Sequence, residues 1–184
     1  MSILSRVVAI ARRKSPWICR LNAGSCNGCD IEITPLLSPR YDAEQLGIEL
    51  HGTPKHADIV LISGTLTHRS RKAILDIYDQ VPSPKAVVAL GSCPASGNVF
   101  AGSPTVLNES LDTIVPVDVW VPGCPPRPQA ILDGIARAAK LLEEGATRSQ
   151  LARSLQGQQA QPQPQPAQPD LTQPELARCE QGRP

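Results

Sequence analysis

Residues 86–93 read Ala-Val-Val-Ala-Leu-Gly-Ser-Cys: an apolar run of five residues, a glycine, and a cysteine three residues beyond the run. The run lacks the alternation of apolar and polar residues expected of a strand with one face in water, so it predicts a strand covered on both faces. Strands of this kind are typical of parallel sheets, in which helices cover both faces. The stretch therefore predicts a fold class and a thiol placed just beyond the end of a strand.

Similar extended runs recur along the chain, at residues 48–50, 58–63 and 117–121. Between them, residues 69–80 and 127–144 carry apolar side chains at helical spacing. Strands that alternate with helices over short connections predict an α/β fold, with a doubly wound, flavodoxin-like and mainly parallel sheet of about four strands. The chain has only 2 Trp, 2 Tyr and 1 Phe, so we expect aliphatic side chains to build the core.

The cysteines follow the predicted strands in a regular way. Cys93 and Cys124 each come three residues after a predicted strand, and Cys26 and Cys29 form a Cys-x-x-Cys pair in a loop that contains glycine. Ligands of an open parallel sheet gather outside the carboxyl ends of its strands, so these loops can bring four thiols to one edge. Four thiolates can hold an iron–sulfur cluster or a structural zinc ion.

An iron–sulfur cluster is the interpretation that the spacing favours. Zinc ribbons pair two Cys-x-x-Cys loops at close range, whereas here the third and fourth thiols are single residues on a sheet that folds without metal. Three alternatives stay open: structural zinc, a thioredoxin-like redox pair at Cys26 and Cys29, and four unrelated buried cysteines. We expect Cys19 to be a core or loop residue and Cys179 to be a spectator in the tail.

The net charge of +1 argues against a nucleic-acid-binding protein, and no apolar run reaches the ~18–20 residues of a transmembrane helix. Residues 1–20 carry five basic and no acidic side chains. Apolar residues recur there at helical spacing before Arg12, Arg13 and Lys14, the reverse of the order in a secretory signal. We therefore expect no export signal, a reducing compartment, and an amphipathic segment that packs on its own domain or docks on a membrane component.

The C-terminal part is rich in Gln and Pro, with prolines at 162, 164, 166, 169 and 174. Such a composition offers little apolar surface to bury and predicts a disordered tail. We thus divide the chain into a basic amphipathic segment (1–20), an iron–sulfur α/β domain (21–148) and a disordered Pro/Gln-rich tail (149–184).

Several motifs together resemble one family: residues 24–32, 38–48, 56–64, 91–93 and 114–126. It is the small (20 kDa, or B-type) iron–sulfur subunit shared by respiratory complex I (NADH:quinone oxidoreductase) and by membrane-bound, energy-converting nickel–iron hydrogenases of the formate-hydrogenlyase type. The resemblance covers residues 12–145. It implies one 4Fe–4S cluster bound by Cys26, Cys29, Cys93 and Cys124, and no catalytic residue in this chain.

The resemblance also implies an electron-transfer role. Such a subunit passes electrons to or from the active site of a large subunit and receives them from a ferredoxin-like iron–sulfur subunit. It lies peripherally on the cytoplasmic face of the inner membrane. Its N-terminal segment holds it there to a membrane-embedded subunit. The Cys26–Cys29 spacing resembles the hydrogenase form, whereas residues 64–67 and 78–82 resemble the quinone-reductase form. Both branches therefore stay open, and Asp30 and Glu32, close to Cys29, are candidates for tuning the site or transferring protons.

Overall fold

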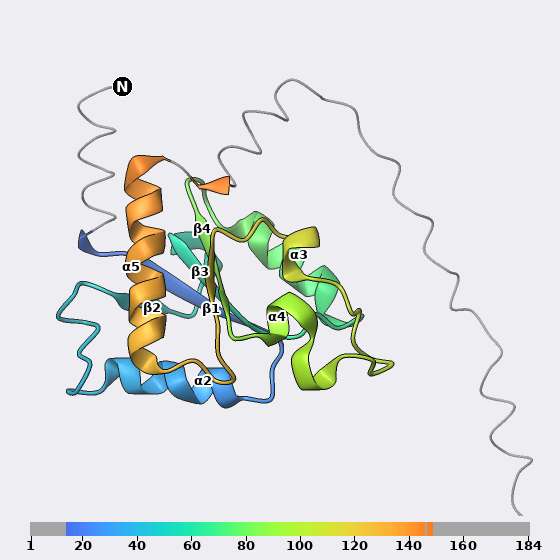
Figure 1. The fold of residues 1–184 in the computed structure, drawn as a ribbon. Helices are drawn as coiled ribbons and strands as arrows, with labels where there is room; N and C mark the ends of the chain where they lie inside the picture. The colour runs from blue at the N-terminus through green and yellow to red at the C-terminus, as the bar shows by residue number, and fades with distance from the viewer. Residues whose placement is uncertain (1–13, 146, 149–184) are drawn as a thin grey trace, which may run out of the picture.

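The computed structural model describes residues 14–145 and 147–148. Five parallel strands form one sheet in the order β2-β1-β3-β4-β5 (Figure 1). The strands are β1 (Trp17–Gly24), β2 (Glu49–His51), β3 (Ile59–Gly64), β4 (Ala86–Leu90) and β5 (Val119–Val121). This order reverses direction between β1 and β3, as in flavodoxin-like sheets, where ligands bind at the carboxyl ends of the strands.

Helices cover both faces of the sheet (Figure 1). The α-helices are α2 (Gly28–Ile33), α3 (Ser70–Gln80), α4 (Cys93–Ser96) and α5 (Pro128–Glu144), and short 3-10 turns lie at η1 (Thr34–Leu37), η2 (Pro54–His56), η3 (Asn98–Phe100) and η4 (Leu111–Thr113). Helices α2 and α5 pack on one face and α3 packs on the other. No helix in the described ranges is long and apolar enough to cross a bilayer.

The predicted α/β fold class and the parallel sheet are confirmed, but the sheet has five strands instead of about four. The missed strand is β1, whose sequence WICRLNAG places the polar side chains of Arg20 and Asn22 among apolar ones. The sheet therefore begins at Trp17, four residues before position 21, where the sequence places the start of the domain. Of the predicted basic segment (1–20), residues 1–13 lie outside the described residues and residues 17–20 belong to β1; the predicted tail (149–184) lies outside them entirely.

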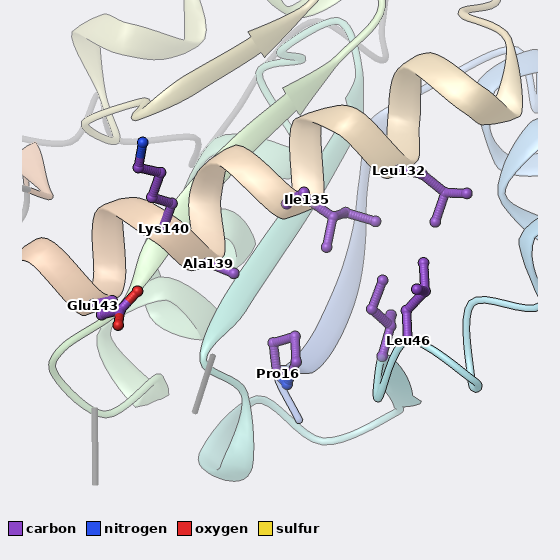
Figure 2. Close-up of a pocket in the computed structure, with 9 residues that line it drawn as sticks. Pro16, Leu46, Leu132, Ile135, Ala139, Lys140 and Glu143 are labelled. Carbon is purple, nitrogen blue, oxygen red and sulfur yellow. The ribbon is translucent and has the colours of Figure 1, made fainter. Parts of the chain in front are cut away.

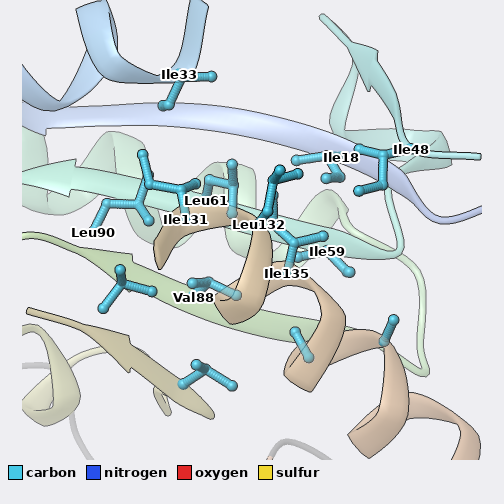
Figure 3. Packing of buried hydrophobic residues seen from close by; sticks show 14 of the residues in the cluster. Ile18, Ile33, Ile48, Ile59, Leu61, Val88, Leu90, Ile131, Leu132 and Ile135 are labelled. Atoms are coloured by element: carbon cyan, nitrogen blue, oxygen red, sulfur yellow. The ribbon is translucent and has the colours of Figure 1, made fainter. Parts of the chain in front are cut away.

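Two apolar cores lie on opposite faces of the sheet. In β3, Ile59 and Leu61 belong to the core under α5, while Val60 and Ile62 belong to the core under α3. Successive side chains of a strand point to opposite faces, so a wholly apolar strand supplies both cores at once. Figure 3 shows the first core, in which side chains from the strands meet those of α5, Ile131, Leu132 and Ile135.

Helix α5 contributes most of the helical surface of this core. Its buried residues include Ile131, Ile135, Ala138 and Leu142, at the spacing of one helical face. The helix begins at Pro128, a residue type that the first turn of a helix tolerates well. It ends before Gly145, whose φ of 68° is a left-handed conformation that glycine adopts readily. These two ends place the start of α5 directly after Cys124, at the carboxyl edge of the sheet.

The substitution Leu61→Ala tests the importance of this core. Leu61 is 1% exposed in the central strand β3, so the truncation leaves a cavity and should lower the free energy of unfolding by about 2–5 kcal/mol. Urea denaturation of the cluster-free protein measures the loss. Leu46→Ala is the matched control, because Leu46 is 61% exposed and its truncation should change stability by about 0.5 kcal/mol or less. Equal losses in the two variants would contradict this assignment of the core.

Candidate functional site

The four candidate cysteines all lie just beyond the carboxyl ends of strands. Cys26 and Cys29 follow β1, Cys93 opens α4 after β4, and Cys124 follows β5. Cys29 is buried, Cys93 is half-buried, and Cys26 and Cys124 are exposed. The parallel sheet thus delivers thiols from three of its strands to the edge where ligands of this architecture bind.

Hydrogen bonds join the loops that follow β4 and β5. The backbone N–H of Gly91 donates to Val121 O at 2.8 Å, and that of Ser92 donates to Gly123 O at 2.9 Å. The Ser92 hydroxyl also donates a hydrogen bond to Gly123 O at 3.3 Å. The residues next to Cys93 and Cys124 are therefore fixed to each other.

Gly91 lets the Cys26–Cys29 loop approach these loops closely, and a Cβ at Gly28 would lie at ordinary van der Waals distance from Cys26 and Pro125. Gly91 has a φ of +85°, and a Cβ built there would lie 2.9 Å from the Sγ of Cys29. A Cβ at Gly28 would lie 3.5 Å from the Sγ of Cys26 and 3.9 Å from Pro125, the residue after Cys124. Glycine is required at Gly91 both for its backbone conformation and because the sulfur occupies the space of a side chain.

The thiols influence one another electrostatically. The pKa of Cys29 is raised to about 11, mainly by burial and to a smaller extent by the nearby Cys93, Cys26, Asp30 and Cys124. Burial also raises the pKa of Cys93, and Cys124 and Cys26 add to it. Four thiolates at this edge would repel one another, and a bound group with positive charge would relieve that repulsion. The donor set therefore fits a cofactor bound through soft sulfur ligands.

Among the described residues, Cys19 is the one cysteine that lies away from this group. Cys19 is 2% exposed in β1, in the core under α3, as the sequence predicts, and burial raises its pKa. Cys179 lies outside the described residues. Over residues 14–145 and 147–148, no three His, Cys, Asp or Glu side chains form a group suited to a single metal ion.

A separate apolar groove of about 330 Å³ lies between α5 and the chain near β2 (Figure 2). Its lining includes Pro16, Leu46, Ile135 and Ala139, and no cysteine contributes to it. The groove is therefore distinct from the cysteine site.

The sequence analysis names Asp30 as a candidate residue but misses the residues that bind its carboxylate and hold the Cys26–Cys29 loop in place. Asp30 is buried and accepts hydrogen bonds from Asn22, Ser25 and Ser63. The pattern Asn22-x-Gly24-Ser25 carries a signal for this arrangement, because an Asn side chain often accepts hydrogen bonds from the backbone two or three residues on. Ser63 gave no signal, because it ends an apolar run and looks like an ordinary buried strand residue.

Comparison with models of protein families shows which family this chain belongs to. Residues 26–138 match the model of the family described as NADH ubiquinone oxidoreductase, 20 Kd subunit. The chain belongs to this 20 kDa subunit family. The match runs from the first candidate cysteine to the middle of α5, so it includes all four cysteines of the site.

Curated relatives are subunits of oxidoreductase complexes. The chain is 54% identical over 129 residues to a probable membrane-bound hydrogenase subunit of Pyrococcus furiosus, covering 70% of this chain and 77% of the relative. It is 44% identical over 132 residues to formate hydrogenlyase subunit 7 of Escherichia coli, covering 72% of this chain and 51% of that protein. The chain thus spans about half the length of the Escherichia coli subunit, and it is itself an oxidoreductase subunit of this 20 kDa family.

A solved structure agrees in fold. A chain of the membrane-bound sulfane sulfur reductase, an archaeal respiratory membrane complex, superposes with a TM-score of 0.66 at 39% sequence identity. The match covers 76% of this chain and 77% of the other. The expected relationship to hydrogenase and quinone-reductase subunits, and the expected class of oxidoreductase subunit, are both confirmed.

The substitution Gly91→Ala tests the close approach of Cys29 to the loop after β4. Both Gly91 and Gly102 have a positive φ, so an alanine at either costs roughly 1–2 kcal/mol in the left-handed region. Only at Gly91 does the new Cβ also meet a sulfur, whereas nothing lies within 4 Å at Gly102. Overpacking adds about 1–3 kcal/mol, so Gly91→Ala should destabilise the cluster-free protein more than Gly102→Ala in urea denaturation. Equal effects would mean that Cys29 does not pack against Gly91.

Proposed function

We propose that this chain carries one 4Fe–4S cluster, bound by Cys26, Cys29, Cys93 and Cys124, and transfers electrons. The electrons would pass to or from the active site of a large subunit in a membrane-associated complex resembling nickel–iron hydrogenases. The observation that carries the proposal is the convergence of the loops after β1, β4 and β5, which brings four thiols to one edge of the sheet. Cysteine thiolates are the usual ligands of such clusters.

When bound, the cluster supplies a one-electron carrier, and the residues of this chain hold it in a defined environment. Burial of Cys29 and Gly91 excludes water from the inner side of the site, and the exposed Cys26 and Cys124 lie on its outer side. A carrier in this position is accessible to a partner on one side and insulated by the sheet on the other. The chain would therefore carry electrons without making or breaking bonds of a substrate.

The hydrogenase branch is favoured by the Cys26–Cys29 spacing and by the 54% identity to the hydrogenase subunit of Pyrococcus furiosus. The alternative is a complex I-type subunit that delivers electrons to quinone, as the family description suggests. A ferredoxin-like iron–sulfur subunit would be the electron donor in either case. A partner large subunit with Cys-x-x-Cys pairs near both ends would identify the nickel–iron branch.

Metal analysis tests the cluster assignment. Anaerobically purified protein should contain about four irons and four sulfides per chain, and dithionite reduction should give a low-temperature EPR signal. Cys93→Ser and Cys124→Ser should each abolish or distort the signal, because each removes one thiolate ligand. Cys179→Ser is the control and should leave it unchanged. Zinc in place of iron, or full cluster content in the Cys93→Ser/Cys124→Ser double variant, would contradict the assignment.

We also propose that the N-terminal segment holds the chain to a membrane-embedded subunit at the cytoplasmic face of the membrane. Residues 3–14 combine an apolar stripe with Arg12, Arg13 and Lys14. Trp17, a residue type enriched at membrane interfaces, follows closely. The segment joins the domain through Pro16, which lines the apolar groove of Figure 2. Residues 149–184, with their Pro/Gln composition, are proposed to be dispensable for folding and cluster binding.

Two deletions separate these roles. Removal of residues 1–13 should leave the EPR signal intact but release the chain, with its large subunit, from membranes. Each basic residue near an anionic surface contributes about 1 kcal/mol, and added salt weakens this attraction. Removal of residues 149–184 is the control and should change neither the signal nor sedimentation with membranes. If the chain without residues 1–13 still sediments with membranes at high salt, another part of the complex is the anchor.

A further inference from the structure

Asp30, the residue after Cys29, is a buried carboxylate at the candidate site, with 5% of its surface exposed. Its two oxygens accept hydrogen bonds from two strands and from the Cys26–Cys29 loop. Oδ2 accepts from Asn22 Nδ2 at 2.8 Å and from the Ser25 hydroxyl at 2.6 Å, and Oδ1 accepts from the Ser63 hydroxyl at 3.0 Å. Asp30 thus ties helix α2 to β1 and β3 beside the buried thiol.

The orientation of the Asn22 side chain follows from its backbone contacts. Its Oδ1 accepts the backbone N–H groups of Gly24 at 2.9 Å and of Ser25 at 2.8 Å. The oxygen must face these donors, so the NH₂ group must face Asp30 and the Ser25 hydroxyl. Asn22 is therefore a fixed donor to the carboxylate.

The Ser25 hydroxyl is also fixed as a donor. Its oxygen accepts from Asn22 Nδ2 at 2.8 Å and from the backbone N–H of Asn27 at 3.2 Å, so both of its lone pairs are used. The hydrogen of the Ser25 hydroxyl is therefore donated to Asp30 Oδ2. With donors on both oxygens, the carboxylate of Asp30 serves this network as an acceptor only.

The charge of Asp30 is only partly balanced. Arg20 Nη1 lies 3.7 Å from Asp30 Oδ1, but the Arg20 side chain is 45% exposed, so water screens its charge. Asp30 itself is buried and screened much less. A net negative charge therefore lies next to Cys29.

We propose that Asp30 is a positioning residue that fixes the Cys26–Cys29 loop and also lowers the reduction potential of the cluster held there. This inference rests on the proposed function, because it needs a cluster bound through Cys29. Reduction adds one electron from an external reductant to the cluster and breaks no bond. The added negative charge is disfavoured beside a buried carboxylate, and the potential of iron–sulfur clusters depends on such nearby charge. Arg20 opposes this effect, so the two side chains should shift the potential in opposite directions.

The test compares three variants of the full complex by EPR-monitored redox titration, with dithionite as reductant, together with iron analysis. Asp30→Asn keeps the size of the side chain and removes the charge, and it should raise the midpoint potential. Arg20→Met removes the opposing charge and should lower the potential by less, since Arg20 is half exposed. Asp133→Asn, on the exposed side of α5, is the control and should leave the potential unchanged.

Opposite shifts in Asp30→Asn and Arg20→Met support the proposal, because mere loosening of the loop would not reverse its sign between the two variants. An unchanged potential in Asp30→Asn, or shifts of the same sign in both variants, would overturn it. If Asp30→Asn fails to take up iron, Arg20→Met decides: a lowered potential supports the proposal, and an unchanged one overturns it. A native complex without any iron at this chain would instead contradict the proposed function itself.

Discussion

The pairing of β4 and β5 does not end with the strands, and the rest of the site depends on this continuation. Backbone hydrogen bonds from Gly91 to Val121 and from Ser92 to Gly123 join the two loops one residue short of Cys93 and Cys124. The sheet therefore sets the separation of these two cysteines through rigid backbone rather than through mobile side chains. Gly91 then leaves room for the sulfur of Cys29, and the third loop can approach. Geometry that is fixed in this way before a cofactor binds reduces the cost of assembling the ligands around it.

Much of this fold follows from two sequence patterns, the unbroken apolar strand and the helical spacing of apolar residues. The run at 86–90 matches β4, and the predicted helices at 69–80 and 127–144 match α3 and α5 to within one residue at each end. These elements are buried on one or both faces, so the packing of each element and the periodicity of its sequence favour the same secondary structure. The placement of Cys93 and Cys124 could be predicted for the same reason, since parallel strands end at one edge.

The contacts that polar residues make around the cysteine site could not be predicted from the sequence. Strand β1 was missed because Arg20 and Asn22 interrupt its apolar pattern, and both contact Asp30. Ser63 is the penultimate residue of β3 and is completely buried, yet its hydroxyl donates to the same carboxylate. Such contacts join residues up to 33 positions apart in the sequence, so no local pattern encodes them. The departures from a simple pattern in β1 are thus explained by contacts around Cys29.

The central claim is that Cys26, Cys29, Cys93 and Cys124 hold one four-iron cluster at the carboxyl edge of the sheet. Anomalous diffraction at the iron absorption edge, from crystals of the intact complex, tests it most directly. The account predicts iron density enclosed by the four Sγ atoms, with each thiolate bound to a different iron of one cluster. Iron density elsewhere on the chain, or anomalous signal at this position only at the zinc edge, would contradict it.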